Sequence, residues 1–371
     1  MPTTTARAVA DTAQRIPLWD NARFLAVTLV VVGHGIQRLT ADSNNALIVY
    51  LFIYGFHMPA FAIISGYFST AGAPTLRRMK QILTRLVIPY LVMEAIWSLV
   101  QFLIEGRGGF NPSKPSWTLW FLLALAIFRL ILPYLALLRW PLIISVLFSV
   151  GVGYLDNVGS TFSLSRAIGI MPFFILGWKV REWGVVGRWQ RLGAAAWWVR
   201  AGSVAVFAGW LCVLGAFIQT WRDIDLRFWF FYDDSYSGLG LESWWAGAIR
   251  LALIVVSVVL CAAFLALVPR SSGWMTDLGK GTMYVYLLHG FVLYPLRESG
   301  FLRGEHASAS WLVLMIVASA AISLVLASRP VRRIARPLIE PRVDWLFARA
   351  PESTPALPTV SVDVARTHRR T

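Results

Sequence analysis

Long apolar segments, separated by short polar ones, follow one another along most of the chain. Ten of them approach the length of about 20 mainly apolar residues that a transmembrane helix needs. They lie at residues 22–39, 46–69, 83–104, 117–138, 140–155, 166–180, 200–219, 246–268, 282–297 and 310–328. The pattern predicts an all-α, polytopic membrane protein with about ten transmembrane helices.

The composition supports this fold class, and the charge adds an orientation. Hydrophobic residues make up 57% of the 371 residues, and charged residues only 14%. A net charge of +15 would suggest a nucleic-acid partner in a soluble chain, but most of the 34 Lys and Arg residues fall on one side of the predicted topology. That side is cytosolic by the positive-inside rule. The sequence therefore predicts cytosolic termini, an inner or plasma membrane, a lipid bilayer as partner, and no nucleic acid.

Three regions are expected along the chain. Residues 1–18 are polar and lack the apolar core of a signal peptide, so they are predicted to be a cytosolic N-terminal segment. Residues 19–345 form the transmembrane domain. Residues 346–371 are predicted to be a disordered cytosolic tail, because they are mainly polar and interrupted by proline.

The first apolar segment contains two polar residues that a membrane helix rarely carries, Arg23 and His34. An ionisable group inside lipid costs about 2.5–3.5 kcal/mol on insertion scales. Eleven positions at about 100° per residue place the two side chains on nearly the same helix face, about 16 Å apart along the axis. They are either a snorkelling arginine with a buried packing histidine, or a functional pair.

Two further histidines lie at membrane depth. His57 falls in the second segment and is followed by Pro59, which is expected to kink the helix or expose a polar lining. His289 falls in the ninth segment. A lone buried histidine is usually structural, but three at similar depth favour a shared polar cavity of His34, His57 and His289.

Charged residues inside the third and fourth segments are assigned to the same cavity. Glu94 is the acidic residue placed inside the membrane, and a cationic partner such as Arg23 or Arg129 is expected for it. Arg129 lies toward the inner half of its segment and could instead snorkel to the headgroups.

A cluster of cations precedes the third segment. It consists of Arg77, Arg78, Lys80 and Arg85. The cluster either only sets the topology or binds a phosphorylated cytosolic ligand, since Arg and Lys suit phosphates.

Aromatic residues concentrate on the predicted outer side. The loop 220–245 mixes them with Asp and Arg, as sugar-binding surfaces do, although interfacial anchoring explains them equally well. Trp117 and Trp120 are interpreted as part of an interfacial belt.

Five segments in order resemble the acyltransferase-3 family of bacterial integral membrane O-acyltransferases, and its fucose 4-O-acetylase-like branch most of all. They are Arg23 with His34 eleven positions later, FHMPAFAIISGYF, SWTLWFLLAL, MPFFILGW and MYVYLLHGF. The resemblance covers residues 15–330. It implies a multi-pass protein of the bacterial cell membrane that moves an acyl group, usually acetyl from cytosolic acetyl-CoA, to a hydroxyl of a sugar, cell-surface glycan or secreted metabolite.

The resemblance also implies residue roles. Arg23 and His34 would be the essential pair, and Arg77, Arg78 and Arg85 would face the phosphates of CoA. The family's polysaccharide-modifying branch often has Arg-x-x-Arg before the proline of the third segment, and position 82 here is Ile, which leaves the roles of Arg78 and Lys80 open.

The chemistry of the residues agrees with acyl transfer. A hydroxyl that attacks a thioester needs a base, and His34 could be that base or a transient acyl carrier. Arg23 could orient the donor or stabilise the oxyanion. No metal, Walker or dinucleotide motif is present, so no metal is expected. A secondary transporter of a small polar solute is the alternative, although no internal repeat supports it. The oligomeric state is not predictable.

Overall fold

The computed structural model describes residues 16–106, 109–300 and 308–347, and the regular elements in this part are all helical. The predicted all-α fold is therefore confirmed. Residues up to Pro341 form one unit, and those from Arg342 form a second, whose described part holds one 3-10 turn, Asp344–Leu346. Of the predicted terminal segments 1–18 and 346–371, residues 1–15 and 348–371 lie outside the described residues.

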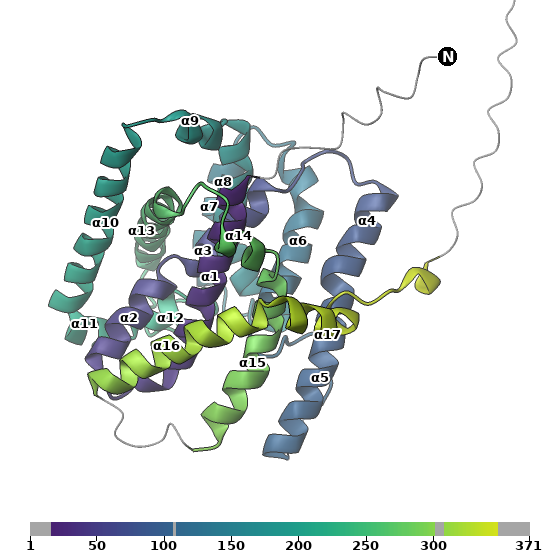
Figure 1. The fold of residues 1–371 in the computed structure, drawn as a ribbon. Coiled ribbons are helices and arrows are strands. Elements are labelled where there is room, and N and C mark those ends of the chain that lie inside the picture. The colour runs from purple at the N-terminus through teal and green to yellow at the C-terminus, as the bar shows by residue number, and fades with distance from the viewer. Residues whose placement is uncertain (1–15, 107–108, 301–307, 348–371) are drawn as a thin grey trace, which may run out of the picture. The chain divides into compact units, whose positions relative to one another are not determined.

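Helices overlap all ten predicted segments. Seven stretches of the described chain are long and apolar enough to cross a membrane, and Trp120–Leu135 and Pro141–Tyr154 are shorter apolar helices. The main helices of the first unit are α1 (Pro17–Ile36), α2 (Asn44–Tyr54), α3 (His57–Tyr67), α5 (Ile88–Glu105), α6 (Trp120–Leu135), α7 (Pro141–Gly151), α8 (Leu164–Glu182), α10 (Ala196–Ala216), α13 (Ala246–Leu267), α15 (Thr282–Glu298) and α16 (Ala309–Leu326) (Figure 1).

The second segment bends at a different place from the one expected. The helix breaks between α2 and α3 at Phe56, whose φ of −147° and ψ of −17° are not helical, whereas Gly55 before it keeps helical angles. Pro59 lies in the first turn of α3, where a backbone N–H has no partner within the helix and its absence costs little. The break therefore places His57 at the start of α3, where its Nδ1 lies 2.9 Å from the carbonyl oxygen of Ile53 in the last turn of α2.

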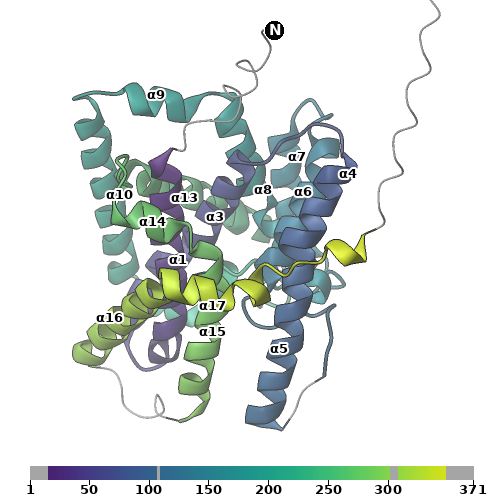
Figure 2. The same cartoon turned by 45° about the vertical axis from the view of Figure 1, so that its right-hand side comes forward.

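Helix α1 lies in the middle of the unit, with α3, α14 (Trp274–Gly279), α15 and α16 around it (Figures 1 and 2). The closest packing is between α3 and α8. A Cβ added to Gly66 would lie 1.9 Å from the carbonyl oxygen of Phe174, and one added to Gly177 would lie 1.9 Å from that of Ile63. Two glycines thus let the backbones of α3 and α8 touch.

The beginning of α1 is fixed by α14. The side-chain amide of Asn21 donates to the carbonyls of Pro269 and Ser271 at 2.9 and 3.0 Å, and the hydroxyl of Thr276 donates to Asn21 Oδ1 at 2.8 Å. Gly279 packs so closely on Asp20 that a Cβ there would lie 2.2 Å from its carbonyl oxygen.

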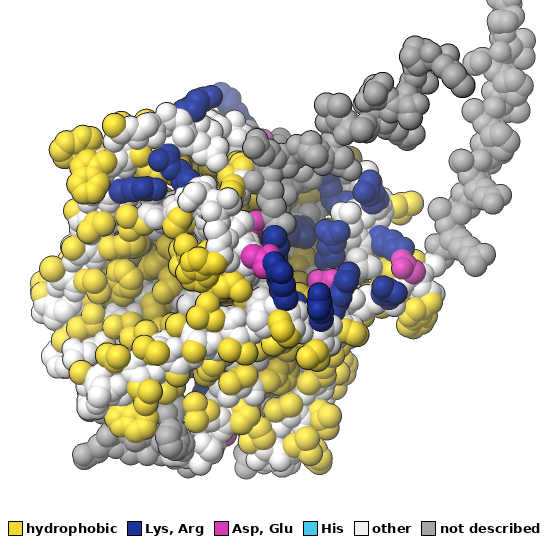
Figure 3. Space-filling model, in the orientation of Figure 1, with side chains coloured by type: hydrophobic (Ala, Val, Ile, Leu, Met, Phe, Trp, Pro, Cys, Tyr) yellow, Lys and Arg dark blue, Asp and Glu magenta, His cyan; other side chains and the backbone are white. Residues whose placement is uncertain are grey.

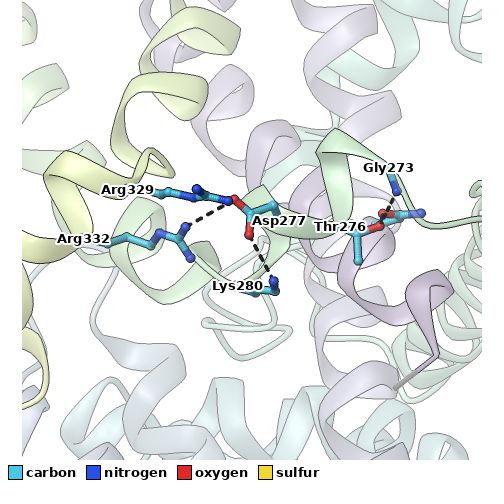
Figure 4. Close-up of polar contacts among 7 residues, drawn as sticks. Gly273, Thr276, Asp277, Lys280, Arg329 and Arg332 are labelled. Atoms are coloured by element: carbon cyan, nitrogen blue, oxygen red, sulfur yellow. Dashed lines mark hydrogen bonds and ion pairs between the residues drawn. The ribbon is translucent and has the colours of Figure 1, made fainter. Parts of the chain in front are cut away.

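Helix α14 is held in turn by α17 (Arg329–Ile339), as Figure 4 shows. Asp277 of α14 forms ion pairs with Lys280 at 3.0 Å, Arg329 at 3.2 Å and Arg332 at 3.6 Å. The hydrogen bond from Lys280, followed by that from Arg329, holds the pKa of the Asp277 carboxyl below its ordinary value. On the face in Figure 3, Lys and Arg side chains gather over this part of the unit, and apolar side chains cover most of the remainder.

The third segment extends further toward the N-terminus than predicted. Helix α4 (Leu76–Ile82) carries three of the clustered cations and continues through a π-helical turn, Leu83–Val87, into α5. Arg85 lies in this π turn. Such turns are frequent at functional sites.

Candidate active site

Two cavities lie along α1, one beside His34 and one beside Arg23. The first, called the histidine cavity, has a volume of about 330 Å³. Its lining combines imidazoles, aromatic rings and polar groups from α1, α2, α3, α6, α8 and the segments between helices: His34, Gln37, Tyr54, His57, Met58, Lys114, Pro115, Trp117, Trp120, Ser160, Ser163, Arg166, Ile170, Phe230, Phe231 and Asp233.

The structure brings the three predicted histidines together. The imidazole centroids of His34 and His289 are 5.4 Å apart. The ring of Tyr54 connects His34 with His57, because its centroid lies 6.5 Å from that of His34 and 4.6 Å from that of His57. His34 and His57 line the cavity, whereas His289 is fully buried behind His34 and Trp117.

Hydrogen bonds fix the tautomers of two of these rings when they are neutral. Nδ1 of His57 lies 2.9 Å from the carbonyl oxygen of Ile53, and Nδ1 of His289 lies 2.9 Å from that of Val285. A carbonyl only accepts, so each Nδ1 carries the proton and each Nε2 carries a lone pair. His34 has no such constraint, because its buried Nδ1 contacts no partner among the described residues.

An ion pair borders the cavity on the side of the outer loop. Arg166 of α8 pairs with Asp233 at 2.5 Å, and its guanidinium lies 5.2 Å from the ring centre of Trp120 and 5.9 Å from that of Phe231. The cavity therefore contains a cation whose charge is already partly neutralised and which can still donate to a ligand.

A buried arginine holds the segment with Phe230, Phe231 and Asp233 in place by hydrogen bonds. Arg250 of α13 is 1% exposed and donates to the carbonyls of Ser149 and Asp234 at 3.2 and 3.3 Å. Burial raises the pKa of the Asp234 carboxyl above its ordinary value, and the neighbouring Asp233 raises it further.

Backbone strain accompanies this cavity. Trp117, Ser163 and Tyr232 have φ values of 41°, 50° and 56°, a region that residues other than glycine rarely adopt. Trp117 and Ser163 line the cavity, and Tyr232 stands between two lining residues. Such strain is held only where the surroundings enforce it, and it concentrates at functional sites.

The second cavity, called the arginine cavity, has a volume of about 310 Å³. It is lined by Arg23, Phe68, Ser69, Thr70, Arg78, Gln81, Ile82, Arg85, Arg129 and Leu132. Arg23 lies 3.4 Å from the carboxylate of Asp20 and 4.5 Å from the ring centre of Phe68. Arg78 donates to the hydroxyl of Thr70 and to the carbonyl of Gly72. Four guanidinium groups from three helical stretches thus face one space.

Several residues lie elsewhere than the sequence indicated. Arg77 and Lys80 do not belong to the lining of the arginine cavity, and Arg129 lines that cavity rather than the one with the histidines. Glu94 is 2% exposed and accepts hydrogen bonds from the backbone N–H of Ser116 at 2.8 Å and from its hydroxyl at 2.7 Å. Ser116 therefore takes the place of the expected cation, and Glu94 fixes the loop that carries Trp117.

The sequence indicates part of the cavity wall only. Trp117 and Trp120 are expected in an interfacial belt and Tyr54 is not singled out, yet all three line the cavity; Arg166, at the outer end of its segment and open to an acceptor or a headgroup, and Asp233 of loop 220–245 line it as well. The one available signal was the mixture of aromatic, Asp and Arg residues in loop 220–245, of which Phe230, Phe231 and Asp233 reach the cavity.

The chain was compared with known proteins. The acyltransferase-3 family model, described as an acyltransferase domain, matches residues 16–328, which include the residues that line both cavities. No curated protein and no solved structure matches the chain. With this match over most of its length, and with helices long enough to cross a membrane, the chain belongs to the acyltransferase-3 family and is a multi-pass membrane acyltransferase.

Proposed function

We propose that this acyltransferase moves an acetyl group from acetyl-CoA to a hydroxyl of a sugar-like acceptor at the cell membrane of a bacterium. The observation that carries the proposal is that two cavities of different chemistry lie along one helix. α1 gives Arg23 to the arginine cavity and His34 to the histidine cavity. These residues are about 16 Å apart along the axis.

The donor is assigned to the arginine cavity. Coenzyme A carries a diphosphate and a further phosphate, and guanidinium groups bind phosphates in charge-assisted pairs. Arg23, Arg78, Arg85 and Arg129 supply the cations there. The positive-inside pattern puts this end of α1 in the cytosol, where acetyl-CoA is found.

The acceptor is assigned to the histidine cavity. Rings of Trp117, Trp120 and Phe231 can stack on the apolar face of a sugar, while Arg166 and Asp233 can take its hydroxyls. This mixture supports a carbohydrate-like acceptor, a glycan or a secreted metabolite, as in the fucose 4-O-acetylase-like branch that the sequence resembles.

The proposed chemical step uses His34 as general base. The acceptor hydroxyl oxygen attacks the thioester carbonyl carbon, and its proton passes to Nε2 of His34. The tetrahedral intermediate collapses with cleavage of the C–S bond, and the proton moves from His34 to the leaving thiolate of CoA. His289 orients His34 through a bridging water in this proposal, because Nδ1 of His34 and Nε2 of His289 are both buried without a partner among the described residues, and a water can accept from the first and donate to the second.

The experiment that tests the proposal uses the purified protein in liposomes with radiolabelled acetyl-CoA. A panel of monosaccharides and a glycan extract serve as acceptors, and mass spectrometry detects the gain of one acetyl group. Transfer by the wild type and its loss in His34→Ala, with unchanged thermal stability, are expected. Uptake of a small polar solute without any acyl transfer would instead favour a transporter.

A further inference from the structure

A third cavity, whose lining shares no residue with the two described above, lies among α1, α3, α8, α9 (Val185–Arg191), α10 and α13. Its volume is about 310 Å³, and its lining is almost entirely hydrocarbon and indole, with Trp19, Trp189, Val199, Val258 and Leu265 among its residues. An apolar cavity of about 150 Å³ already stays dry and takes up a small apolar molecule. This larger one, called here the apolar cavity, therefore suits an apolar chain rather than water.

A cationic space adjoins the apolar cavity. It has a volume of about 420 Å³ and is lined by Arg200, Leu267, Pro269, Arg270 and Ser271. Consecutive residues line the two spaces. On α10, Val199 lines the apolar cavity and Arg200 the cationic space; on α13, Ala266 lines the apolar cavity and Leu267 the cationic space. The guanidinium of Arg270 lies 4.9 Å from the ring centre of Trp189, which lines the apolar cavity.

The cations of this space are not neutralised by the part of the chain that the structure describes. Arg270 donates to the carbonyls of Trp189 and Leu192 at 2.9 and 3.4 Å, and neither Arg200 nor Arg270 forms an ion pair with a described residue. The buried Nε of Arg200 finds no acceptor among these residues either. A buried donor without a partner is costly, so the geometry leaves room for an external anion.

We infer that the cationic space and the apolar cavity together bind one anionic glycerophospholipid, with its phosphate between Arg200 and Arg270 and an acyl chain in the apolar cavity. The charge complementarity selects an anionic headgroup, and the hydrocarbon lining selects the chain. Leu18 and Trp19, which precede the segment with Arg23, also line the cavity, at the end of α1 that the positive-inside rule places in the cytosol. The lipid is therefore one of the inner leaflet.

The inference stands apart from the proposed reaction, and its test does not need activity. The protein is purified in mild detergent, delipidated, and titrated with dioleoyl-phosphatidylglycerol or dioleoyl-phosphatidylcholine. Bound lipid is counted by native mass spectrometry, and the melting temperature is followed in parallel, because a ligand that binds only the folded state raises it. Phosphatidylglycerol is expected to bind with one-to-one stoichiometry and to raise the melting temperature more than phosphatidylcholine.

Variants divide the site into its two parts. Arg200→Gln removes the charge and should weaken phosphatidylglycerol binding by about tenfold, because it removes a charge-assisted contact, and Arg200→Lys should restore part of it. Ala262→Phe places a ring in the apolar cavity and should reduce binding of both lipids; Ala262 is exposed in this lining, so the ring does not overpack the core. Arg191→Gln, an exposed cation on α9 outside both linings, is the matched control.

Three results would overturn the inference. Equal affinity for the two lipids would show ordinary annular lipid. Unchanged phosphatidylglycerol binding in both Arg200→Gln and Ala262→Phe would place the lipid elsewhere. Displacement of phosphatidylglycerol by an acyl-CoA, with loss in Arg200→Gln, would make the space a donor site instead. Gel filtration of every variant shows whether it is folded.

Discussion

The imidazole rings of His34 and His289 lie 5.4 Å apart between centroids, although their helices come from opposite ends of the chain. Nδ1 of His34 and Nε2 of His289 are both buried and find no partner among the described residues. Since Nε2 of His289 can only accept, the pair is poised for a proton on Nδ1 of His34. Nε2 of His34 then carries a lone pair, as the proposed role of His34 as general base requires.

This pairing predicts different outcomes for two substitutions of His289. His289→Gln keeps an acceptor oxygen and should retain part of the activity, whereas His289→Ala should reduce kcat by about 10²-fold, the scale of lost base catalysis. KM for the acceptor should change little in both. Radiolabelled transfer assays give these constants, and equal activities of the Gln and Ala variants would remove the orienting role.

The arginine cavity predicts which cations bind the donor. Arg85→Glu should weaken acetyl-CoA binding by about tenfold, since it removes one charge-assisted phosphate contact and adds a repulsion. Arg77→Glu is the matched control, because Arg77 is not part of the lining. The rise of the melting temperature with acetyl-CoA measures the effect. An equal loss in both variants would show a diffuse effect of surface charge.

The wall of the histidine cavity predicts a change in acceptor affinity only. Phe231→Leu keeps the apolar character of the position but removes the ring, so KM for a sugar acceptor should rise several-fold through lost stacking. KM for acetyl-CoA should stay unchanged. Steady-state kinetics with each substrate varied in turn separates the two. A rise of both constants would contradict separate donor and acceptor cavities.

The contact between α3 and α8 predicts the cost of a single methyl group. Gly66→Ala should lower the free energy of unfolding by about 1–3 kcal/mol, because the added Cβ meets a backbone carbonyl that cannot move alone. Gly202→Ala, whose Cβ meets no atom within 4 Å, is the control in a membrane helix. Thermal denaturation in detergent compares them, and equal melting temperatures would mean that the two helices separate without cost.

The cluster around Asp277 predicts a pH-dependent stability. Its pKa is lowered in the folded protein, so its ion pairs stabilise the fold above the ordinary pKa of Asp, about 3.9, and this contribution is lost as the pH falls through the lower folded value. Asp277→Asn should therefore lower the melting temperature at pH 7, and the difference from wild type should shrink below pH 4. Asp42→Asn, an exposed carboxylate outside the cluster, should show no such trend.

The helices were predictable because apolar length alone identifies them. Their breaks were not, since Pro59 is obvious in the sequence but tolerated in a first turn, whereas Phe56, where the helix breaks, is inconspicuous. The close contacts of Gly66 and Gly177 depend on which helix packs against which. The apolar pattern of one sequence does not show that α3 and α8 are neighbours.

The candidate site residues that could be identified from the sequence are ionisable side chains, which are rare in membrane helices. Arg23, His34, His57 and His289 were identified because buried ionisable groups are costly. Glu94 was placed correctly inside the structure, but its partner, Ser116, comes from a loop whose course depends on tertiary packing. Trp117 was interpreted as interfacial because tryptophan is common there; only the fold shows its ring 5.0 Å from that of His34.

The π turn at Leu83–Val87 changes the direction in which side chains before it point relative to side chains after it. One extra residue rotates everything before it by about 100° relative to everything after it. Arg78 and Arg85, before and within the turn, line the arginine cavity, while Glu94 and Trp97, further along the same stretch, are buried in the core. A one-residue deletion that made the helix regular would rotate the residues before the turn by about 100° relative to Glu94 and Trp97, and would so turn Arg78 away from the cavity that it lines.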